Sequence, residues 1–228
     1  MRGIAFVTRA GTALKSVLNA IAGLVVLPLV GGYRLAAALW PARKDALFQG
    51  YSELVSLWPG MSGNYLRRAF YRSTLRRCPA ECAIEFGTIF ATAEVDIGDH
   101  VYIGAYCMIG HATIGDDVLI GSKVDILSGK HQHHFDRLDV PIRLQGGAYT
   151  RVTIGADAWI GNGATILDDV GSQAVVAAGA VVVKRVNARA IVGGNPAAVL
   201  GHRGSKTAER GHEATTQRGH VPPEVGVS

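Results

Sequence analysis

Three of the eight histidines of the chain stand close together, in a segment that also carries carboxylates. The segment is SGKHQHHFDRLDVPIRLQGGAYTR at residues 128–151, and its histidines are His131, His133 and His134. Removal of a proton from a substrate group needs a base, and imidazole is suited to that task near neutral pH. Asp136 is close enough in sequence to orient an imidazole. The segment therefore predicts general-base chemistry at one of its histidines.

This segment interrupts a repeat of six residues that begins near Ile84. The repeat is marked by an aliphatic residue followed by glycine, at Ile97-Gly98, Ile103-Gly104, Ile109-Gly110, Ile114-Gly115, Ile120-Gly121, Ile154-Gly155 and Ile160-Gly161. In each hexad a short strand points one aliphatic side chain inward, and a tight corner follows where Gly, Asp or Asn accepts unusual backbone angles. Three such sides close one coil, and stacked coils bury their aliphatic residues in a continuous column. The pattern predicts a parallel β-helix at residues 81–200, with loop 128–151 inserted and one coil shortened around residues 168–171.

Residues 1–80 differ from the rest in charge and hydropathy. They contain eleven Lys and Arg against Asp45 and Glu53 alone, and residues 16–33 carry no charge. We expect a helical, membrane-associating region that binds an anionic membrane surface rather than nucleic acid. The apolar segment is compatible with a span, a re-entrant segment or an interfacial helix, and a signal peptide is a further alternative.

A second basic segment covers residues 63–78. Arg68, Arg72 and Arg76 are spaced four apart, so they share one helix face that is suited either to lipid headgroups or to packing on the β domain. At the other end of the chain, residues 201–228 are polar and lack periodicity, which predicts a disordered tail.

Residues 84–200 resemble the hexapeptide-repeat acyltransferase superfamily. The resemblance rests on the hexads, on the single inserted loop, on VTIGADAWIGNGATIL at 152–167 and on GGNPAAVL at 193–200. The segments FQGYSEL and YLRRAFYRSTLRRC resemble acetyltransferases of bacterial polysaccharide pathways. The resemblance implies an all-β, left-handed parallel β-helix with an N-terminal α-helical extension. It also implies an acetyl-CoA donor, a homotrimer with sites between subunits, and a sugar acceptor. The membrane-seeking N-terminal region favours a polysaccharide or glycolipid precursor as the acceptor, at the cytoplasmic side of the inner membrane, where coenzyme A is available.

The same resemblance places the catalytic histidine in the inserted loop. A Ser-Gly-x-x-Gln-His pattern of close relatives matches Ser128, Gly129, Gln132 and His133, whereas a looser alignment with sugar acetyltransferases favours His131. Both histidines remain candidates for the base.

The pantetheine arm of coenzyme A must lie close to the backbone, which favours small residues on the downstream coils. The candidates are Gly161, Gly163, Ala164, Ala178, Gly179 and Ala180. Trp159 is expected to flank the arm, and Lys184 or Arg185 to meet the nucleotide phosphates. Ala198 stands where the family often has a basic residue, which shifts that contact to Lys184 or Arg185.

Two other functions fit parts of the sequence. The fold also carries a zinc carbonic anhydrase, for which His100, His111 and the loop histidines would be the ligands, but the paired His-x4-His arrangement of that group does not occur. A non-catalytic, membrane-tethered β-helix scaffold would need neither the loop histidines nor a coenzyme site. We expect an enzyme without a metal.

Overall fold

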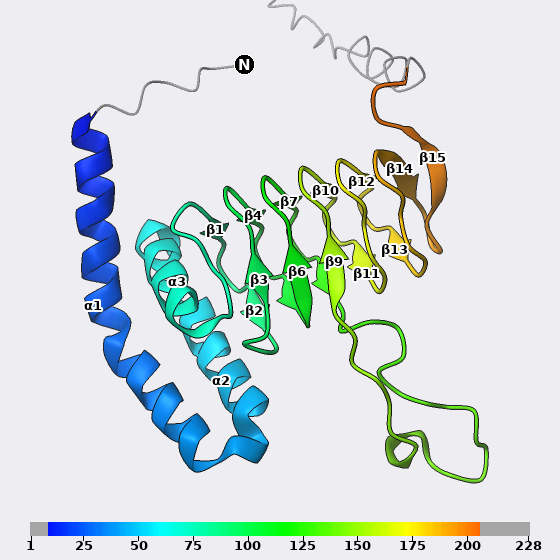
Figure 1. The fold of residues 1–228 in the computed structure, drawn as a ribbon, viewed down its shortest axis with the longest axis horizontal. Helices are drawn as coiled ribbons and strands as arrows, with labels where there is room; N and C mark the ends of the chain where they lie inside the picture. Colours follow the sequence, from blue (N-terminus) through cyan, green and yellow to red (C-terminus); the bar gives the residue numbers. More distant parts are fainter. Residues whose placement is uncertain (1–8, 206–228) are drawn as a thin grey trace, which may run out of the picture.

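The computed structural model describes residues 9–205, and its N-terminal part is a layer of three helices (Figure 1). Helix α1 (Arg9–Leu39) is followed by a short 3₁₀ turn, η1 (Pro41–Arg43), and by α2 (Lys44–Ser56) and α3 (Gly60–Thr74). Helix α1 packs on α2 and α3, which in turn contact β2 and β1. The expected N-terminal helical extension is therefore confirmed, and its helices form part of the packed core together with the β-helix.

The remaining described residues form a parallel β-helix of short strands in three sheets. The first sheet contains β1 (Ala83–Ile84), β4 (Tyr102–Ile103), β7 (Leu119–Ile120), β10 (Trp159–Ile160), β12 (Val175–Val176), β14 (Ala190–Gly193) and β15 (Ala198–His202). The second contains β2 (Ile89–Phe90), β5 (Met108–Ile109), β8 (Asp125–Ile126), β11 (Thr165–Ile166) and β13 (Val181–Val182). The third contains β3 (Asp96–Ile97), β6 (Ala112–Ile114) and β9 (Val152–Ile154).

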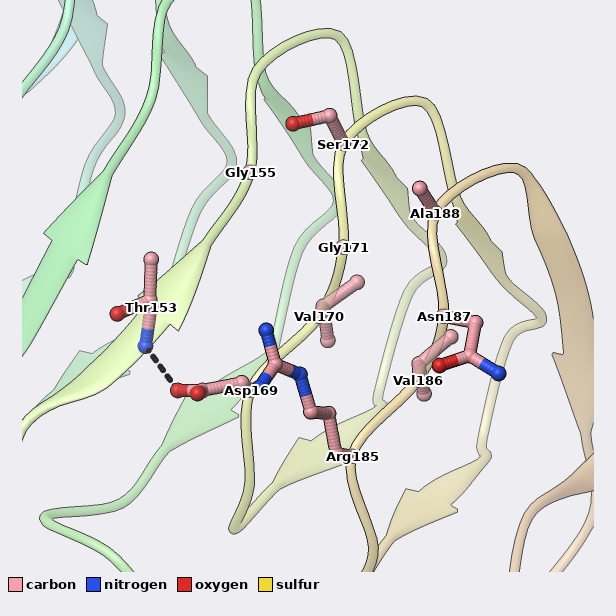
Figure 2. A pocket seen from close by; sticks show the side chains of 10 residues that line it. All are labelled: Thr153, Gly155, Asp169, Val170, Gly171, Ser172, Arg185, Val186, Asn187 and Ala188. Atoms are coloured by element: carbon pink, nitrogen blue, oxygen red, sulfur yellow. Dashed lines mark hydrogen bonds between the residues drawn. The ribbon is translucent and has the colours of Figure 1, made fainter.

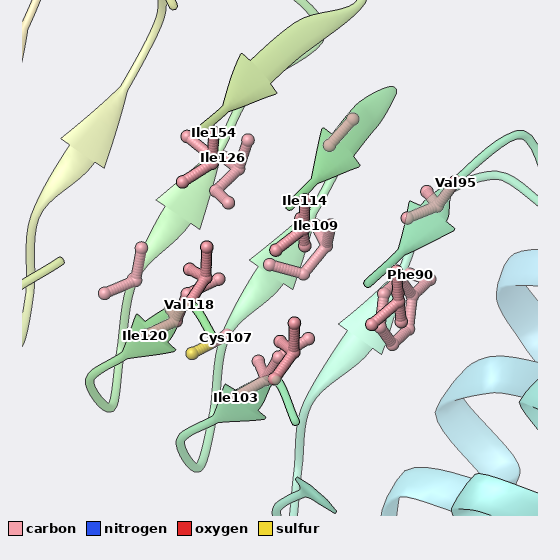
Figure 3. Packing of buried hydrophobic residues seen from close by; sticks show 14 of the residues in the cluster. Phe90, Val95, Ile103, Cys107, Ile109, Ile114, Val118, Ile120, Ile126 and Ile154 are labelled. Atoms are coloured by element: carbon pink, nitrogen blue, oxygen red, sulfur yellow. The ribbon is translucent and has the colours of Figure 1, made fainter. Parts of the chain in front are cut away.

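The aliphatic residues of the hexads line one shared interior, as predicted. Ile103 stacks on Ile120 in the first sheet, and Ile120 stacks on Ile160. Ile109, from the second sheet, is buried in the same cluster (Figure 3). Ile97, from the third sheet, belongs to that cluster as well. Each strand thus contributes one inward side chain, and burial of the column supplies the main driving force for folding.

The glycines of the Ile-Gly pairs serve close stacking rather than unusual backbone angles. A Cβ on Gly104 would lie 2.6 Å from the carbonyl carbon of Gly121 in the next coil. The left-handed backbone angle falls two residues later, on Tyr106 (φ 58°) and Lys123 (φ 58°). The sequence-based expectation that Gly, Asp or Asn would take this angle is correct for Asp117, Asp157 and Gly163, and wrong for Tyr106 and Lys123.

The shortened coil lies where the sequence predicts it. On the third side of the column, residue Val170 alone replaces a strand and bridges Ile154 and Val186. Each of these positions is sixteen residues from the next, and the paired residues Ile160 and Val176 of the first sheet have the same separation. The column therefore narrows towards its C-terminal end without losing phase.

Both ends of the column are covered, which removes exposed strand edges. At the first coil, Ser52 of α2 accepts a hydrogen bond from the backbone N–H of Phe90, and the buried Arg67 of α3 donates to the carbonyl of Ile84 (2.7 Å). At the last coil, β15 pairs antiparallel with β14. Strand β15 extends to His202, beyond the predicted start of the tail, and the prediction of disorder for residues 206–228 lies outside the described residues.

We predict that Ile120→Ala destabilises the protein by about 2–5 kcal/mol, because it leaves a cavity in the column. Leu119 is the matched control, since it is adjacent in sequence but 51% exposed, whereas Ile120 is fully buried. Leu119→Ala should cost under about 1 kcal/mol. Denaturant unfolding followed by circular dichroism measures both, and equal effects of the two changes would contradict the assigned interior.

Candidate active site

The inserted loop leaves the column after β8, at the corner between the second and third sheets, and returns at β9 (Figure 1). Its two ends run side by side as a hydrogen-bonded stem, in which the N–H of Thr150 donates to the carbonyl of Ser128 and that of Ala148 to the carbonyl of His131. The tip contains a 3₁₀ turn, η2 (Ile142–Leu144). The stem fixes where the loop begins, while the tip extends away from the column.

Both candidate bases lie in this stem. His131 and His133 are exposed, so their imidazoles are accessible to a substrate. The preceding residue, Lys130, pairs with Asp168 on the next coil (Nζ to Oδ2, 2.9 Å), which ties the stem to the column. Asp136, expected to orient an imidazole, is exposed further along the loop, and its carboxylate has no hydrogen-bond partner among the described residues.

A hollow of about 360 Å³ lies beside the base of the loop. Its walls come from α2, the first three coils and the returning strand of the loop, and consist of Asp45, Ala91, Thr92, Glu94, His111, Ser128 and Tyr149. Two carboxylates, two aliphatic hydroxyls, a phenol and an imidazole therefore face one space. Sequence analysis did not find this set, because the residues lie far apart in the chain and meet only through the stacking of coils.

His111 is held in one protonation state at the wall of this hollow. The guanidinium of Arg151 donates to Nε2 of His111 (2.7 Å), and it also contacts Asp96 (3.2 Å). Burial, followed by the charge of Arg151, lowers the pKa of His111. Because an arginine has no acceptor, Nε2 must be unprotonated and the proton must lie on Nδ1. His111 is thus a neutral imidazole that can donate one hydrogen bond.

The small residues proposed for coenzyme A divide into two groups. Ala164 and Ala180 are fully buried in the column and have no surface to offer a ligand, so this part of the prediction is wrong. Gly161 is buried as well, and a Cβ there would lie 2.4 Å from the backbone nitrogen of Ala178, so its role is close stacking. The others, Gly163, Ala178 and Gly179, are exposed along the corner between the first and second sheets.

Trp159 and the two basic candidates lie on other parts of the column. Trp159 is 54% exposed on the outer face of the first sheet, in register with Leu119. Lys184 and Arg185 follow β13 at the corner between the second and third sheets. A single subunit therefore does not bring Trp159 next to the histidines of the loop.

Arg185 lines a second hollow, of about 570 Å³, on the third side of the column (Figure 2). The carboxylate of Asp169 lines the same hollow and accepts a hydrogen bond from the N–H of Thr153 (2.8 Å). A carboxylate in the wall disfavours a phosphate there. Lys184, one residue nearer the second sheet, does not line this hollow.

The zinc hypothesis finds no geometric support. In residues 9–205, no three His, Cys, Asp or Glu side chains are grouped so that they would hold a metal ion. His100 instead faces Asp117 at an exposed corner (3.3 Å), and His111 is bonded to Arg151.

Two sequence families match the β-helix. Residues 94–126 match the family described as bacterial transferase hexapeptide (six repeats), and residues 151–184 match the hexapeptide repeat of succinyl-transferase. The two matches lie on either side of the inserted loop.

Nodulation protein L of Rhizobium leguminosarum bv. viciae is 40% identical over 80 residues, which are 34% of this chain and 40% of that protein. The chain thus spans well under half the length of this relative. A maltose O-acetyltransferase from Clostridium difficile 630 has a similar fold, with a TM-score of 0.58 at 21% identity over 71% of this chain and 89% of the other. A galactoside acetyltransferase in complex with coenzyme A gives a TM-score of 0.53 at 21% identity over 70% and 80%. The two family matches show hexapeptide repeats on both sides of the inserted loop, and the two solved structures show that the fold of this chain is similar to theirs.

Proposed function

We propose that this protein is an acetyl-CoA-dependent O-acetyltransferase that acts on a sugar. The observation that carries the proposal is the position of the histidine loop, whose stem rises beside a hollow lined by carboxylates, hydroxyls and a neutral imidazole. The names of the similar proteins, a maltose O-acetyltransferase and a galactoside acetyltransferase, agree with this chemistry.

The hollow suits the acceptor. Asp45 and Glu94 would accept hydrogen bonds from sugar hydroxyls, while Nδ1–H of His111 would donate one. Tyr149 adds an aromatic face at the mouth of the loop. An acidic, hydroxyl-rich wall fits a neutral polyhydroxyl compound better than an anionic acceptor.

His131 or His133 is proposed as the base. Its imidazole takes the proton of the acceptor hydroxyl as the oxygen attacks the thioester carbonyl. Collapse of the tetrahedral intermediate breaks the carbon–sulfur bond, and the departing thiolate takes the proton back from the imidazolium. Backbone N–H groups near Gly146 and Gly147 are candidates for stabilising the oxyanion.

We place the donor along the outer face of the second sheet. The exposed residues Gly163, Ala178 and Gly179 border that face at one corner, and Lys184 borders it at the other. The small residues allow the pantetheine arm to approach the backbone, and Lys184 offers a charge to the phosphates. Arg185 is a weaker candidate, since it faces the hollow that contains Asp169.

The small residues proposed to bind coenzyme A and the inserted loop lie at different edges of one column. We therefore propose a homotrimer in which each active site forms between two subunits. The first sheet offers a surface for this contact, because Tyr102, Leu119 and Trp159 form an exposed apolar row across three neighbouring strands. Such a row favours contact with another copy. In a trimer, Trp159 of one subunit would flank the site of its neighbour.

The described chain is proposed to work in two parts, with residues 1–80 providing the membrane-binding region and residues 81–200 forming a left-handed β-helix. Acetyl-CoA is a cytoplasmic metabolite, which places the enzyme on the cytoplasmic side of the inner membrane. A sugar of a polysaccharide or glycolipid precursor is then the acceptor.

We predict that replacing the true base by Ala lowers kcat by about 10²–10⁴-fold, because proton removal is lost. His131→Ala and His133→Ala are measured separately in a thiol-release assay with acetyl-CoA. His134→Ala is the control from the same stem. Full activity in both single variants would show that neither histidine is the base.

We predict that Lys184→Ala raises the KM for acetyl-CoA by about tenfold, since it removes a charge-assisted hydrogen bond to phosphate. Arg185→Ala is the matched control and should change this KM less. If the Arg185 variant shows the larger effect, the donor lies on the third side of the column instead.

We predict that Glu94→Gln raises the KM for the sugar acceptor by about tenfold and leaves the KM for acetyl-CoA unchanged. Glu94 also pairs with Lys44 (3.3 Å) on the surface. Lys44→Gln removes the same ion pair but keeps the carboxylate, so it controls for lost stability. Equal effects of the two changes would argue against an acceptor role for the hollow.

A further inference from the structure

We infer that the helical layer lies in the plane of one membrane leaflet, with the outer face of α1 inserted, and that α1 does not cross the bilayer. The β-helix then stands on the membrane with its coils stacked away from it. This inference concerns how the protein binds the membrane and does not depend on the acetyltransferase activity.

One face of α1 is apolar and uncovered. Its large exposed side chains are Leu14, Val17, Leu18, Ile21, Leu24, Val25, Leu27, Leu35 and Leu39, and the exposed Trp40 follows directly after the helix. In Figure 1 this helix is the outermost layer, on the side of α2 and α3 opposite to the column. An uncovered apolar face of this length is far larger than a soluble surface normally tolerates.

The connection between α2 and α3 extends the same surface. The exposed apolar residues here are Leu54 near the end of α2, Leu57 and Trp58 in the connection, and Met61 at the start of α3, which is 81% exposed. Two apolar hollows, of about 220 and 300 Å³, lie between α1 and this connection, and both are lined by Val25, Trp58 and Leu66. They are suited to the ends of lipid acyl chains. A helix that crossed the membrane alone would not need this second apolar element.

The opposite face of α1 is packed and tied to the rest of the protein. Ala22, Val26, Val30 and Tyr33 are buried. Polar contacts hold the helix at three points along its length, namely Lys15 with Glu81 (2.5 Å), Asn19 with Arg68 (2.7 Å) and Arg34 with the carbonyl of Ser73 (2.9 Å). Two of these partners lie on α3, which packs on β1.

These ties are incompatible with a span. The 26-residue segment Leu14–Leu39 has a length of about 39 Å, enough for the bilayer core of about 30 Å. However, a crossing α1 would carry α3 and the first coil to the same depth, including the buried Arg67 and Arg68. Unpaired charges and strand ends at that depth are strongly disfavoured. Insertion of one face in the plane of the interface avoids this cost.

Charge identifies a bilayer, rather than another protein, as the occupant of this surface. Residues 14–74 contain seven Lys and Arg against two acidic residues. Of these, Arg43, Lys44 and Arg72 are exposed. The tryptophans Trp40 and Trp58 are also exposed at the ends of helices. Basic residues and tryptophan around an apolar face are typical of helices that lie in an anionic membrane interface.

Of the two alternatives for Arg68, Arg72 and Arg76, packing on the β domain is the one that the structure shows for α3, and a shared face of three arginines on one helix is not found. Arg68 is buried and bonds the carbonyl of Cys82, and Arg76 lies beyond α3 and pairs with Asp96 (2.8 Å). Only Arg72 of the three remains for headgroups. The membrane surface is therefore α1 with the α2–α3 connection, and α3 is an internal layer.

Sedimentation with vesicles of phosphatidylcholine containing phosphatidylglycerol tests the surface. The double change Leu24→Glu and Leu35→Glu, on the outer face of α1, should weaken binding by at least about tenfold, and Trp58→Ser should weaken it as well. Val199→Glu with Leu200→Glu is the matched control, since these residues are equally exposed at the far end of the column. Unchanged binding in the α1 variant, with or without an altered oligomeric state, would overturn the inference. Acetyl transfer to a soluble sugar is measured in parallel, so that loss of activity is not mistaken for loss of membrane binding.

Protease digestion of inverted inner-membrane vesicles tests the orientation. The full chain carries a cleavable epitope tag at each end. If the helices lie in one leaflet, both tags are digested without detergent while the protein remains in the vesicle fraction. Protection of the N-terminal tag alone would show that α1 crosses the membrane and would overturn the inference.

Discussion

The close stacking of one coil directly on the next is the contact on which the rest of the structure depends. Each coil is so short that each of its sides buries only two side chains, such as Val118 and Ile120, and no coil is stable alone. The corners must therefore approach within contact distance, which is why a Cβ at Gly115 or Gly155 would clash with the coil that follows. An insertion is tolerated only at a corner, and the loop between β8 and β9 enters and leaves at one such corner without shifting the register of Ile114 with Ile154.

Stacking also explains how residues far apart in sequence reach one site. Corner residues of successive coils lie about 4.8 Å apart along the column, so Glu94, His111 and Ser128 line one hollow although they are separated by seventeen residues at each step. The helical layer closes this hollow with Asp45. The proposed acceptor pocket therefore lies at the membrane end of the column, which favours an acceptor that is itself anchored to lipid.

The β-helical column could be predicted from the sequence, but much of the candidate site could not. Periodicity fixed the strands, the interior and the shortened coil, because a hexad has one inward position that only an aliphatic residue can fill. It did not reveal that the glycine after each isoleucine serves stacking, that Ala164 and Ala180 are interior, or that Arg151 sets the protonation of His111. Those properties depend on the neighbouring coil, which is not adjacent in sequence. The role of Arg67 could not be predicted either. In the sequence, a buried arginine that donates to strand carbonyls cannot be told from an arginine of a basic helix at the membrane surface.

In the proposed reaction, a sugar hydroxyl at the membrane takes the acetyl group directly from coenzyme A, while a histidine of the loop removes the hydroxyl proton. The most direct measurement follows radiolabel from acetyl-CoA after incubation of the purified full-length protein with bacterial membranes. The account predicts label in the lipid-extractable glycan fraction, released by mild alkali as expected for an O-ester. Label confined to soluble amines, or resistant to alkali, would contradict it.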